Sequence, residues 1–448
     1  MPTLYGRRCE PSIDCWLVAS GSPASFCLIG GAAKVPIDPD QVFFVQADAP
    51  LPGAKGVVCL GMLQILVWGG SFFLLAVMGE PITRDTGWAA HWVYGSLSLS
   101  LMVAAFLAPL SSRLVARHGG RIQLACSGAI VALGLLMVAA SHTLVWFMLA
   151  WTVIGVGMAC GLYETLFSTL GALYGERAGK AITGITLISG FATTLSWPLV
   201  ALAIQHLGWR SACVAYALLL LVVVAPAYLC VLPAGGQITH RSASTIAPAK
   251  RLDQRVYLLL TWIFALGAII MTAISVQLVA VLQGMGFSLA AAIGLCAVLG
   301  PSQVASRILQ MLASKRHPVW TALVSAVLVA VGMVLVTTVP GMAVLGLVLY
   351  GLGNGLRAIV RGLLPLALMP PAQYVSLMGK MSRPSLIGQA LTPVVGGFVL
   401  QHFGAQAVLI TLCCVALLNL LLVVLVLRHL QRLRATGVAP TVEGISHE

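Results

Sequence analysis

Charged side chains are scarce in this sequence. Only 8% of the 448 residues are Asp, Glu, Lys or Arg, whereas 59% are hydrophobic, and the mean hydropathy is +1.00. Ordinary soluble chains contain about 25% charged residues, so this composition excludes a soluble globular protein. Apolar runs of about 20 residues, the length that crosses a bilayer, recur from Val57 to Leu427. Membrane β-barrels would instead show alternating segments of about 10 residues. The sequence therefore predicts an all-α membrane protein.

Motifs for nucleotide hydrolysis, metal binding and catalysis are also lacking. No GxxxxGK[ST] loop occurs, because GERAGK at 175–180 has the wrong spacing and no following Ser or Thr. The nine histidines are scattered without ligand spacing, and the eleven cysteines give no disulfide framework. Most of these cysteines lie in apolar runs, where Cys acts as a small apolar side chain. We therefore predict no enzyme activity, no catalytic residue, no metal site and no cofactor.

Twelve apolar runs have the length of a transmembrane helix. The predicted spans are 57–79, 89–110, 122–140, 144–168, 182–205, 211–231, 256–281, 288–312, 319–338, 342–366, 384–402 and 406–427. They form two six-helix halves, 57–231 and 256–434, joined by a linker with Pro and Gly at 232–255. Residues 435–448 form a tail. Residues 1–56 are expected to be a disordered extension, or the product of a start codon assigned too early.

Positive charge is concentrated on one side of this topology. Of the 25 Lys and Arg, twenty lie in segments assigned to the cytoplasm, two (Arg84 and Arg210) lie outside, and three lie within helices. This positive-inside bias predicts a multi-pass protein of the cell inner (cytoplasmic) membrane with both termini in the cytoplasm. The net charge of +13 is thus a topology signal. The expected partners are the lipid bilayer and a small-molecule substrate, with no nucleic acid and no obligatory protein partner.

The tenth predicted span carries three polar side chains on one face. Asn354, Arg357 and Arg361 are spaced i, i+3 and i+7. An arginine at the bilayer centre costs about 2.5–3.5 kcal/mol on insertion scales, so two on one stripe indicate a polar interior rather than lipid. We expect this helix to line a solute pathway, with Arg357 and Asn354 as substrate contacts. Arg361, nearer the cytoplasmic end, is expected to snorkel or to act in gating.

The loop between the second and third predicted spans is strongly basic. In PLSSRLVARHGGR, Arg113, Arg117 and Arg121 recur every four residues, and Gly119–Gly120 make a turn. Here the sequence resembles the major facilitator superfamily, which has a Gly- and Arg-rich motif ending in a basic turn at this place. The family's leading Gly and its Asp before the Arg are absent. The resemblance implies a major facilitator fold of twelve helices in two halves and secondary transport by alternating access.

An internal repeat also indicates two related halves. A shift of 196 positions superimposes five identical residues: Gly155, Gly157, Gln205, His206 and Gly208 fall on Gly351, Gly353, Gln401, His402 and Gly404. Transporters built from parallel repeats bind their substrate between the halves, near the membrane midplane. The repeat therefore predicts a substrate site between the two halves.

Arg307 in the eighth predicted span is another buried cation. The segment GPSQVASRIL is similar to that of monocarboxylate-transporter-like members of the superfamily, which have an Asp and an Arg four residues apart on this helix. The resemblance implies that Arg307 holds the substrate carboxylate, which a planar guanidinium binds with two parallel hydrogen bonds. Gln303 stands at the position of the Asp, which is linked to proton coupling in those members. The alternative is that Arg307 snorkels to the cytoplasmic face and anchors the helix.

Glu164 is the only carboxylate deep within a predicted span. An arginine that approaches and leaves a carboxyl group can make that group release and bind protons. Glu164 is therefore a candidate proton carrier. Alternatively it pairs with Arg361, its pseudo-equivalent in the second half, to close a cytoplasmic gate, or it makes a structural bond to a neighbouring helix. Further expected substrate contacts at cavity depth are Trp68, Tyr163, Gln277 and Gln303.

Three buried arginines against one buried carboxylate favour an anionic substrate. We expect a secondary active transporter that moves a small organic anion, such as a monocarboxylate, by alternating access and in symport with a proton. The alternative is an efflux pump for drugs or hydrophobic metabolites, in which the arginines are only structural. A membrane sensor is a remote alternative, because no output domain fits the short linker or tail.

Overall fold

The computed structural model of the chain describes residues 26–29, 33–36, 51–233, 253–312, 317–369 and 371–435. The chain divides into two compact units, of which the smaller comprises residues 1–45 and 237–250. The described part of this smaller unit is an antiparallel strand pair, β1 (Phe26–Ile29) and β2 (Ala33–Pro36). From the sequence no strand is expected in the extension, so this pair is a correction; Phe26, Ile29 and Val35 are residue types that favour strands. The rest of the predicted extension up to residue 50, most of the linker and the tail from residue 436 lie outside the described residues.

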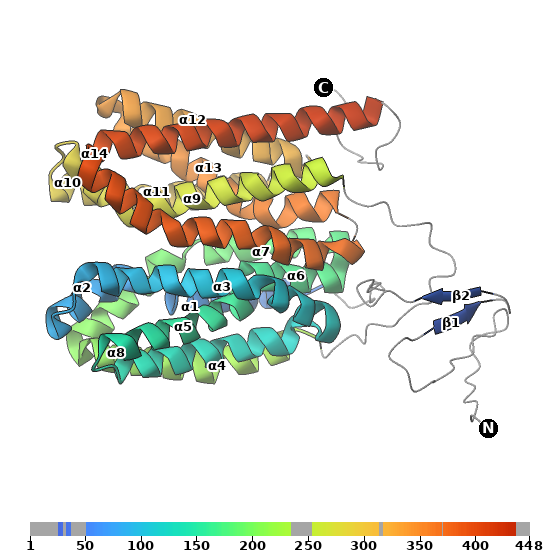
Figure 1. The fold of residues 1–448 in the computed structure, drawn as a ribbon, viewed down its shortest axis with the longest axis horizontal. Coiled ribbons are helices and arrows are strands. Elements are labelled where there is room, and N and C mark those ends of the chain that lie inside the picture. Colours follow the sequence, from blue (N-terminus) through green and yellow to red (C-terminus); the bar gives the residue numbers. More distant parts are fainter. Residues whose placement is uncertain are drawn as a thin grey trace. The chain divides into compact units, whose positions relative to one another are not determined.

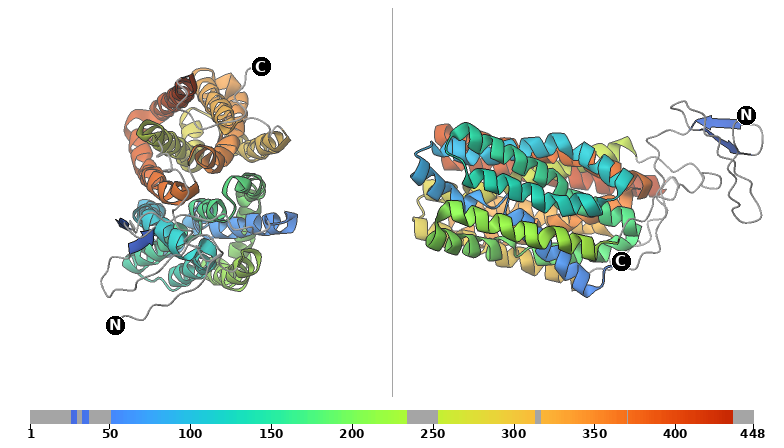
Figure 2. Two further views of the ribbon diagram at one scale, coloured as in Figure 1. Left: turned by 90° about the vertical axis from the view of Figure 1, so that its right-hand side faces the viewer. Right: turned by 90° about the horizontal axis from the view of Figure 1, so that it is seen from below.

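The larger unit, residues 46–236 and 251–448, forms two bundles of helices, seen from the side in Figure 1 and from one end in the left view of Figure 2. The first bundle consists of α1 (Ala54–Gly69), α2 (Leu75–Thr86), α3 (Ala90–His118), α4 (Gly120–Ala139), α5 (Leu144–Gly161), α6 (Tyr163–Tyr174), η1 (Gly175–Arg177), α7 (Ala178–Ser189) and α8 (Ala192–Val231). The second consists of α9 (Gln254–Gly284), α10 (Leu289–Ala297), α11 (Leu299–Leu312), α12 (Pro318–Thr338), η2 (Pro340–Met342), α13 (Ala343–Leu368) and α14 (Pro371–Ala435).

Two long helices are interrupted by glycines at equivalent positions of the repeat. Gly208 in α8 has φ 77° and ψ 161°, and Gly404 in α14 has φ 81° and ψ 176°. Glycine alone adopts this region of backbone space without strain. The interruptions divide apolar segments of 54 and 60 residues. Because a helix rises about 1.5 Å per residue and the bilayer core is roughly 30 Å thick, each segment contains two membrane crossings.

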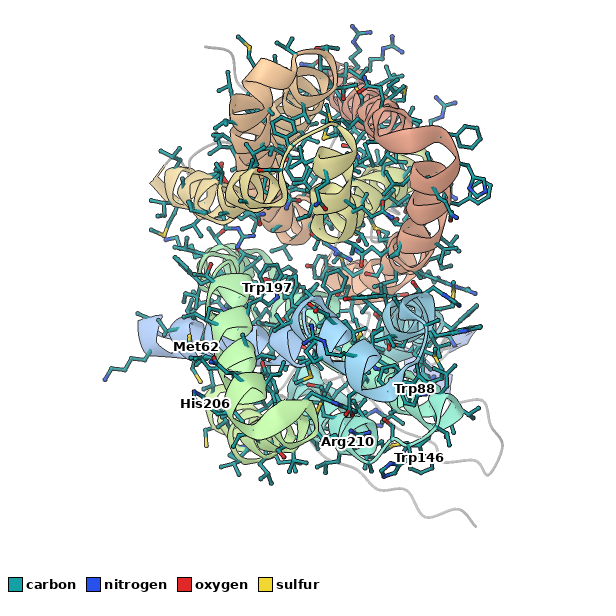
Figure 3. The ribbon with its side chains drawn as sticks, turned by 90° about the vertical axis from the view of Figure 1, so that its left-hand side faces the viewer. Met62, Trp88, Trp146, Trp197, His206 and Arg210 are labelled. Carbon is teal, nitrogen blue, oxygen red and sulfur yellow. The ribbon has the colours of Figure 1, made fainter. Side chains whose placement is uncertain are left out.

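Nine helices in the described part of the chain are long and apolar enough to cross a membrane. Two of these nine are the long segments interrupted at Gly208 and Gly404, and each of them contains two crossings. With the shorter apolar helix α1, the arrangement is compatible with the predicted twelve crossings. Many large apolar side chains point outward; Val145 and Val222 are each 71% exposed. Tryptophans favour the membrane–water boundary, and Trp88 and Trp146 lie with Arg210 toward the viewer in Figure 3. The chain is a multi-pass membrane protein.

The glycines related by the repeat make matching contacts between helices. Gly157 of α5 packs against α4, and Gly353 of α13 packs against α12, each with no room for a Cβ atom. Gly155 faces α3, and Gly351 faces α11, which holds the equivalent place in the second bundle. Small residues allow two helix backbones to approach closely. The repeat in the sequence is thus also a repeat in the packing of the two bundles.

Four predicted spans contain breaks that the apolar pattern does not reveal. The first is interrupted at residues 70–74, the fourth at Leu162, the fifth at residues 190–191 and the eighth at Val298. Irregular backbone at membrane depth is tolerated where protein buries it and other groups bond its polar atoms. These breaks matter for function because two of them, at Leu162 and at residues 190–191, border the candidate site.

The segment GEPITRDTGW at 79–88, which joins the first two predicted spans outside the membrane, is mostly helical, so the first span does not end in a loop at residue 79. Helix α2 continues to Thr86 and ends where Gly87 adopts a left-handed conformation with φ 69°. The N–H of Gly87 donates to the carbonyl oxygen of Thr83 at 3.0 Å, which is a common way to end a helix. An ion pair between Arg84 and Glu80, four residues apart, lies on its exposed face.

Candidate functional site

The break in the fourth predicted span sets two polar side chains, Tyr163 and Glu164, at the beginning of a short helix. Leu162 is extended, with φ −77° and ψ −179°, so that α5 ends at Gly161 and α6 begins at Tyr163. Glu164 is therefore in the first turn of α6. The free N–H groups and the dipole at the beginning of a helix favour a negative charge there. The local backbone thus provides a place for an ionised Glu164.

Side chains from three helices bond the carbonyl groups that this break leaves without helical partners. Gln64 of α1 donates through Nε2 to the carbonyl oxygen of Gly161 at 2.9 Å. The hydroxyls of Ser111 in α3 and Thr165 in α6 donate to the carbonyl oxygen of Ala159 at 2.8 and 2.9 Å. Buried carbonyls require such partners. Gln64, which is fully buried, therefore stabilises the break.

Glu164 and Arg361 form an ion pair between the two bundles. The Nη2 atom of Arg361 in α13 bonds Oε1 of Glu164 in α6, and the two side chains are only 10% and 14% exposed. Such a pair between Glu164 and Arg361 is one of the alternatives given for Glu164 in the sequence analysis, in which it closes a cytoplasmic gate. An ion pair so far from bulk water is screened little. It therefore couples α6 to α13 in this conformation.

Arg307 of α11 also bridges the bundles, but through main-chain carbonyl groups. Its Nη1 donates to the carbonyl oxygen of Thr186 in α7 at 2.6 Å, and its Nε donates to that of Gly355 in α13 at 3.3 Å. Thr186 lies in the last turn of α7, where the helix dipole favours a cation. The side chain is 5% exposed and occupies the space that Gly190 leaves by having no Cβ atom. Arg307 is therefore buried and does not snorkel to a surface in this conformation.

Aromatic rings adjoin these charges. The hydroxyl of Tyr163 lies 2.6 Å from that of Ser189 in α7. The Tyr163 ring stacks on Phe167 with centroids 5.2 Å apart and lies 5.1 Å from Trp68 of α1. Tyr163 interacts electrostatically with Glu164, Arg307 and Arg361. We call Trp68, Tyr163, Glu164, Arg307 and Arg361 the inter-bundle cluster.

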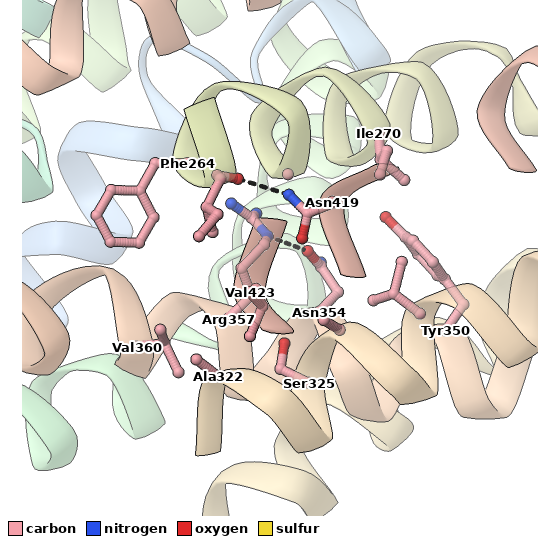
Figure 4. A pocket seen from close by; sticks show the side chains of 14 residues that line it. Phe264, Ile270, Ala322, Ser325, Tyr350, Asn354, Arg357, Val360, Asn419 and Val423 are labelled. Atoms are coloured by element: carbon pink, nitrogen blue, oxygen red, sulfur yellow. Dashed lines mark hydrogen bonds between the residues drawn. The ribbon is translucent and has the colours of Figure 1, made fainter. Parts of the chain in front are cut away.

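Arg357 and Asn354, expected on the same stripe as Arg361, have a different environment. They line a cavity of about 30 Å³ among α9, α12, α13 and α14, all of the second bundle (Figure 4). Nε of Arg357 donates to Oδ1 of Asn354 at 3.0 Å. Arg357 and Arg361 lie on the same helical stripe but have different partners because their side chains are long: Arg361 reaches out to α6, while Arg357 packs on Gly267 of α9.

A second, smaller cavity of about 10 Å³ touches Glu164. Helices α3, α5, α6 and α14 line it, and Ser111, Ser112 and Thr165 contribute hydroxyl groups. A volume of about 10–15 Å³ on this measure is the space for one water molecule, provided that polar partners are near. Glu164 therefore has room for a single bound water beside it.

The two predicted glutamine contacts, Gln277 and Gln303, bond or pack against other groups. Gln277 of α9 donates through Nε2 to the carbonyl oxygen of Pro393 in α14 at 3.1 Å, and its buried Oε1 has no partner among the described residues. The carbonyl oxygen of Gln303 in α11 accepts from Ser306 at 2.9 Å and lies against Gly355. Within the described part of the chain, no hydrogen bond joins either side chain to the inter-bundle cluster.

The basic loop forms the tight connection that its sequence indicates. Helix α3 ends at His118, Gly119 has φ 75°, and α4 begins at Gly120, which has no room for a Cβ atom beside Thr169. Arg121 donates from Nε to the carbonyl oxygen of Leu229 at 3.1 Å, close to the end of α8. Arg113 and Arg117 are exposed. We call this end of the larger unit the α3–α4 end.

The bundles pack closely near the α3–α4 end. A Cβ atom at Gly379 of α14 would lie 3.0 Å from the carbonyl oxygen of Ala108 in α3, and one at Gly362 of α13 would lie 3.1 Å from the Phe167 ring in α6. The hydroxyl of Tyr374 in α14 donates to the carbonyl oxygen of Gly362 at 3.3 Å, and its ring covers Gly171 of α6. Such glycine contacts allow the helices of the two bundles to approach closely at this end.

Comparison with protein families gives a decisive match. The model of the Major Facilitator Superfamily matches residues 60–356, which is more than half of the chain. The chain belongs to this superfamily. It is therefore a secondary transporter rather than an enzyme, and members of this superfamily bind small-molecule substrates within the membrane.

Individual relatives of this transporter are distant. Monocarboxylate transporter 3 of Rattus norvegicus is 27% identical over 241 residues, which are 50% of this chain and 48% of that protein. The match thus spans about half the length of that relative. The human organic anion transporter MFSD10 (TETRAN) has a similar structure, with a TM-score of 0.63, 18% identity and coverage of 83% of this chain and 100% of that one. The transporter FucP in its outward conformation has a TM-score of 0.66, 12% identity and coverage of 84% and 99%. These structures establish the fold of the transporter.

Sequence reasoning selected the charged residues of the site but missed several neutral ones. The cavity beside Arg357 is also lined by Tyr350 and Asn419. Tyr350 precedes Asn354 by four residues, so the helical spacing that links Asn354 to Arg357 also points to Tyr350. Asn419 interrupts the apolar run LLNLLL and carries a similar signal. Gly190 could not be found this way, because its role depends on the position of Arg307.

Proposed function

We propose that the transporter moves a small organic anion, such as a monocarboxylate, and that Arg307 binds its carboxylate. The observation that carries this proposal is a buried guanidinium between the bundles that belongs to no ion pair among the described residues. A buried cation is costly unless an anion or several hydrogen bonds compensate it. Two main-chain carbonyls bond Arg307 here, and the guanidinium has five N–H donors. A substrate carboxylate would supply the missing negative charge.

The charge of the whole region supports an anionic substrate. Arg357 of α13 interacts electrostatically with both Arg307 and Arg361, and Glu164 is already engaged by Arg361. The region therefore has an excess of positive charge that a neutral or cationic substrate would not relieve. The names of two similar proteins, a monocarboxylate transporter and an organic anion transporter, agree with this substrate class. The expected substrate contact of Arg357 is not part of this proposal, because Arg357 lines a separate cavity within the second bundle.

Alternating access would work by breaking and remaking the contacts between the bundles. The α3–α4 end carries the basic loop, so the positive-inside rule assigns it to the cytoplasm, with both termini there. The close glycine packing and the Glu164–Arg361 pair then close the cytoplasmic side. Opening requires that the ion pair separates and that Arg307 releases Thr186 of the first bundle. A carboxylate bound to Arg307 would replace that carbonyl contact and so favour the change.

Proton coupling would act through Glu164. Protonation of this carboxyl group removes the charge that holds Arg361, and the two side chains can then separate. The small cavity beside Glu164 has room for one water that could deliver the proton. Proton binding and gate opening would thus be linked at one residue. This makes symport of an anion with a proton the proposed mode of transport in the cytoplasmic membrane.

The alternative function, efflux of drugs or hydrophobic metabolites, also has a supporting observation. The rings of Trp68, Tyr163 and Phe167 stand together beside the charges. Aromatic surfaces bind apolar and cationic compounds. In such a pump, Arg307 would only hold the helices together, and its replacement would affect stability rather than substrate choice.

Uptake into proteoliposomes distinguishes these functions. Purified transporter is tested with an imposed pH gradient and radiolabelled monocarboxylates, dicarboxylates and cationic drugs. We expect monocarboxylate uptake that Arg307→Gln lowers at least 100-fold, while the matched exposed variant Arg84→Gln leaves it unchanged. Unchanged anion uptake in Arg307→Gln would exclude the assigned carboxylate site. Drug transport without any anion transport would exclude the proposed function and favour the efflux pump.

A further inference from the structure

The cavity beside Arg357 has features of a binding site that transport itself does not require. It lies within the second bundle, among α9, α12, α13 and α14, and has a volume of about 30 Å³. Most of its lining is apolar. Its polar groups come from Arg357, Asn354, Tyr350, Ser325 and Asn419, all labelled in Figure 4. The question is what these polar groups would hold in an otherwise apolar space.

Hydrogen-bond donors outnumber acceptors in this cavity. Nε of Arg357 is satisfied by Oδ1 of Asn354 at 3.0 Å. No hydrogen bond within the described part of the chain uses the two Nη atoms of Arg357, Nδ2 of Asn354 or the hydroxyl of Tyr350. Asn354 is 7% exposed and Tyr350 is 2% exposed, and both side chains line the cavity together with Arg357. Buried donors require acceptors.

The other two polar side chains each already donate a hydrogen bond to the protein. Nδ2 of Asn419 donates to the carbonyl oxygen of Ile263 at 2.7 Å, which fixes the amide of α14 against α9. The hydroxyl of Ser325 donates to the carbonyl oxygen of Gly353 at 2.7 Å. Both contacts hold helices of the bundle in place around the cavity. They orient its walls and leave Arg357, Asn354 and Tyr350 as the free donors.

The electrostatics of the cavity favour a negative charge. Arg357 belongs to none of the ion pairs formed by the described residues. Its neighbours Arg307 and Arg361 interact with it as like charges, and Glu164 is bonded to Arg361. An arginine without a counter-charge in a mostly apolar cavity is unfavourable. Binding of an anion would remove this cost.

We propose that the cavity is a binding site for a small monovalent inorganic anion, chloride in the cell, held by Arg357, Asn354 and Tyr350. The size of the space selects this class, because about 30 Å³ holds one or two water-sized particles and is too small for an organic acid. The ion would neutralise Arg357 and join α13 to the surrounding helices. The site is separate from the substrate carboxylate proposed for Arg307, and it does not depend on which substrate is transported.

Direct binding of radioactive chloride tests the proposal. Purified transporter in lipid nanodiscs is equilibrated with ³⁶Cl⁻, with gluconate as the replacement anion, and bromide and gluconate serve as competitors. We expect saturable binding of one chloride per chain that bromide displaces and gluconate does not. Arg357→Gln should weaken it at least tenfold, and Tyr350→Phe, which removes one hydroxyl, several-fold. Arg84→Gln, at an exposed position of α2, should bind as wild type.

Thermal unfolding provides the second measurement. When gluconate in the buffer is replaced by chloride, at a concentration ten times the dissociation constant of chloride, the unfolding midpoint of the wild type should rise by about 2 °C. This rise should vanish in Arg357→Gln. Absence of saturable chloride binding by the wild type would overturn the proposal. So would wild-type affinity in Tyr350→Phe, a variant conservative enough to fold. Failure to transport any organic anion would refute the proposed function but not this site, because binding is measured without transport.

Discussion

Removal of Glu164 or Arg361 tests the ion pair that joins the two bundles. Glu164→Gln keeps the shape of the side chain but leaves Arg361 buried and uncompensated, with Arg307 and Arg357 nearby as like charges. Arg361→Gln leaves Glu164 without its cation. Because both side chains are at least 86% buried, as their exposures of 14% and 10% imply, solvent compensates neither loss. Each single variant should therefore destabilise this conformation strongly.

The magnitude follows from the burial of the pair. Removal of one partner of a buried ion pair costs about 3–5 kcal/mol, much of it from the charge left behind. The double variant, Glu164→Gln with Arg361→Gln, leaves no unpaired charge. It should therefore be less destabilised than the sum of the single variants by about 2–4 kcal/mol, which is the coupling free energy of the pair.

The assay is a double-mutant cycle on the free energy of unfolding. Purified transporter in mixed micelles is unfolded with increasing detergent denaturant and followed by the fluorescence of its 10 tryptophans. The chain offers a matched control in Arg84 and Glu80, an ion pair of α2 whose side chains are 79% and 74% exposed. This exposed i, i+4 pair should show a coupling of only about 0.3–0.5 kcal/mol. If the effects at Glu164 and Arg361 were additive to within about 0.5 kcal/mol, the pair would not join the bundles.

Three further predictions concern single positions. Gly404→Ala should lower the free energy of unfolding by about 1–3 kcal/mol, because the residue has φ 81° and ψ 176°, a conformation that strains an alanine backbone. The added Cβ atom would meet no other atom within 4 Å, so backbone strain accounts for the whole effect. An unchanged free energy of unfolding would contradict this backbone conformation. Gly190→Ala puts a Cβ atom against Nη1 of Arg307 and should displace the guanidinium. Anion uptake should therefore fall about tenfold or more, as expected for a misplaced binding group. Uptake at the wild-type rate would show that Arg307 is free to move. The pKa of Asp85 is held below its usual value by hydrogen bonds from Arg210 and Trp209, so this carboxylate stabilises the folded state above pH about 4, and the stabilisation is lost as the pH falls through the lowered pKa. The difference in thermal midpoint between wild type and Asp85→Asn should therefore narrow from pH about 6 to pH about 3. A difference that stays constant over this range would contradict the prediction.

The broken helices explain how charged side chains are accommodated in an apolar protein. At Leu162 and at residues 190–191 the helix ends, so that free main-chain groups become available at membrane depth. Glu164 occupies the beginning of α6 and Arg307 bonds the last turn of α7, and both positions match the direction of the helix dipole. The charges of the inter-bundle cluster are thus partly stabilised by backbone. This reduces the cost of separating them when the bundles move.

Much of the fold was predictable from the sequence because the bilayer imposes a simple rule. A helix that crosses lipid needs an apolar run of fixed length, so the predicted spans at 122–140, 319–338 and 342–366 agree with α4, α12 and α13 to within two residues at each end. The positions of Gly208 and Gly404 in the repeat marked the two places where long helices turn. The scarcity of charge also singled out Glu164, Arg307, Arg357 and Arg361, since each ionised group in such a chain needs a reason to be buried.

Only the tertiary structure decided what these charged residues contact. The spacing of Arg357 and Arg361 sets both on one helical stripe, yet Arg361 pairs with Glu164 of the other bundle while Arg357 turns into a cavity of its own. Helical spacing defines the direction of a Cβ atom, whereas a long arginine side chain can reach partners on several neighbouring helices. The break at Leu162 was equally hidden, because its carbonyl groups are bonded by Gln64, Ser111 and Thr165, which are distant in sequence or on another turn. Sequence thus determined which segments cross the membrane and which residues are costly to bury, and packing between helices determined how each of those costs is met.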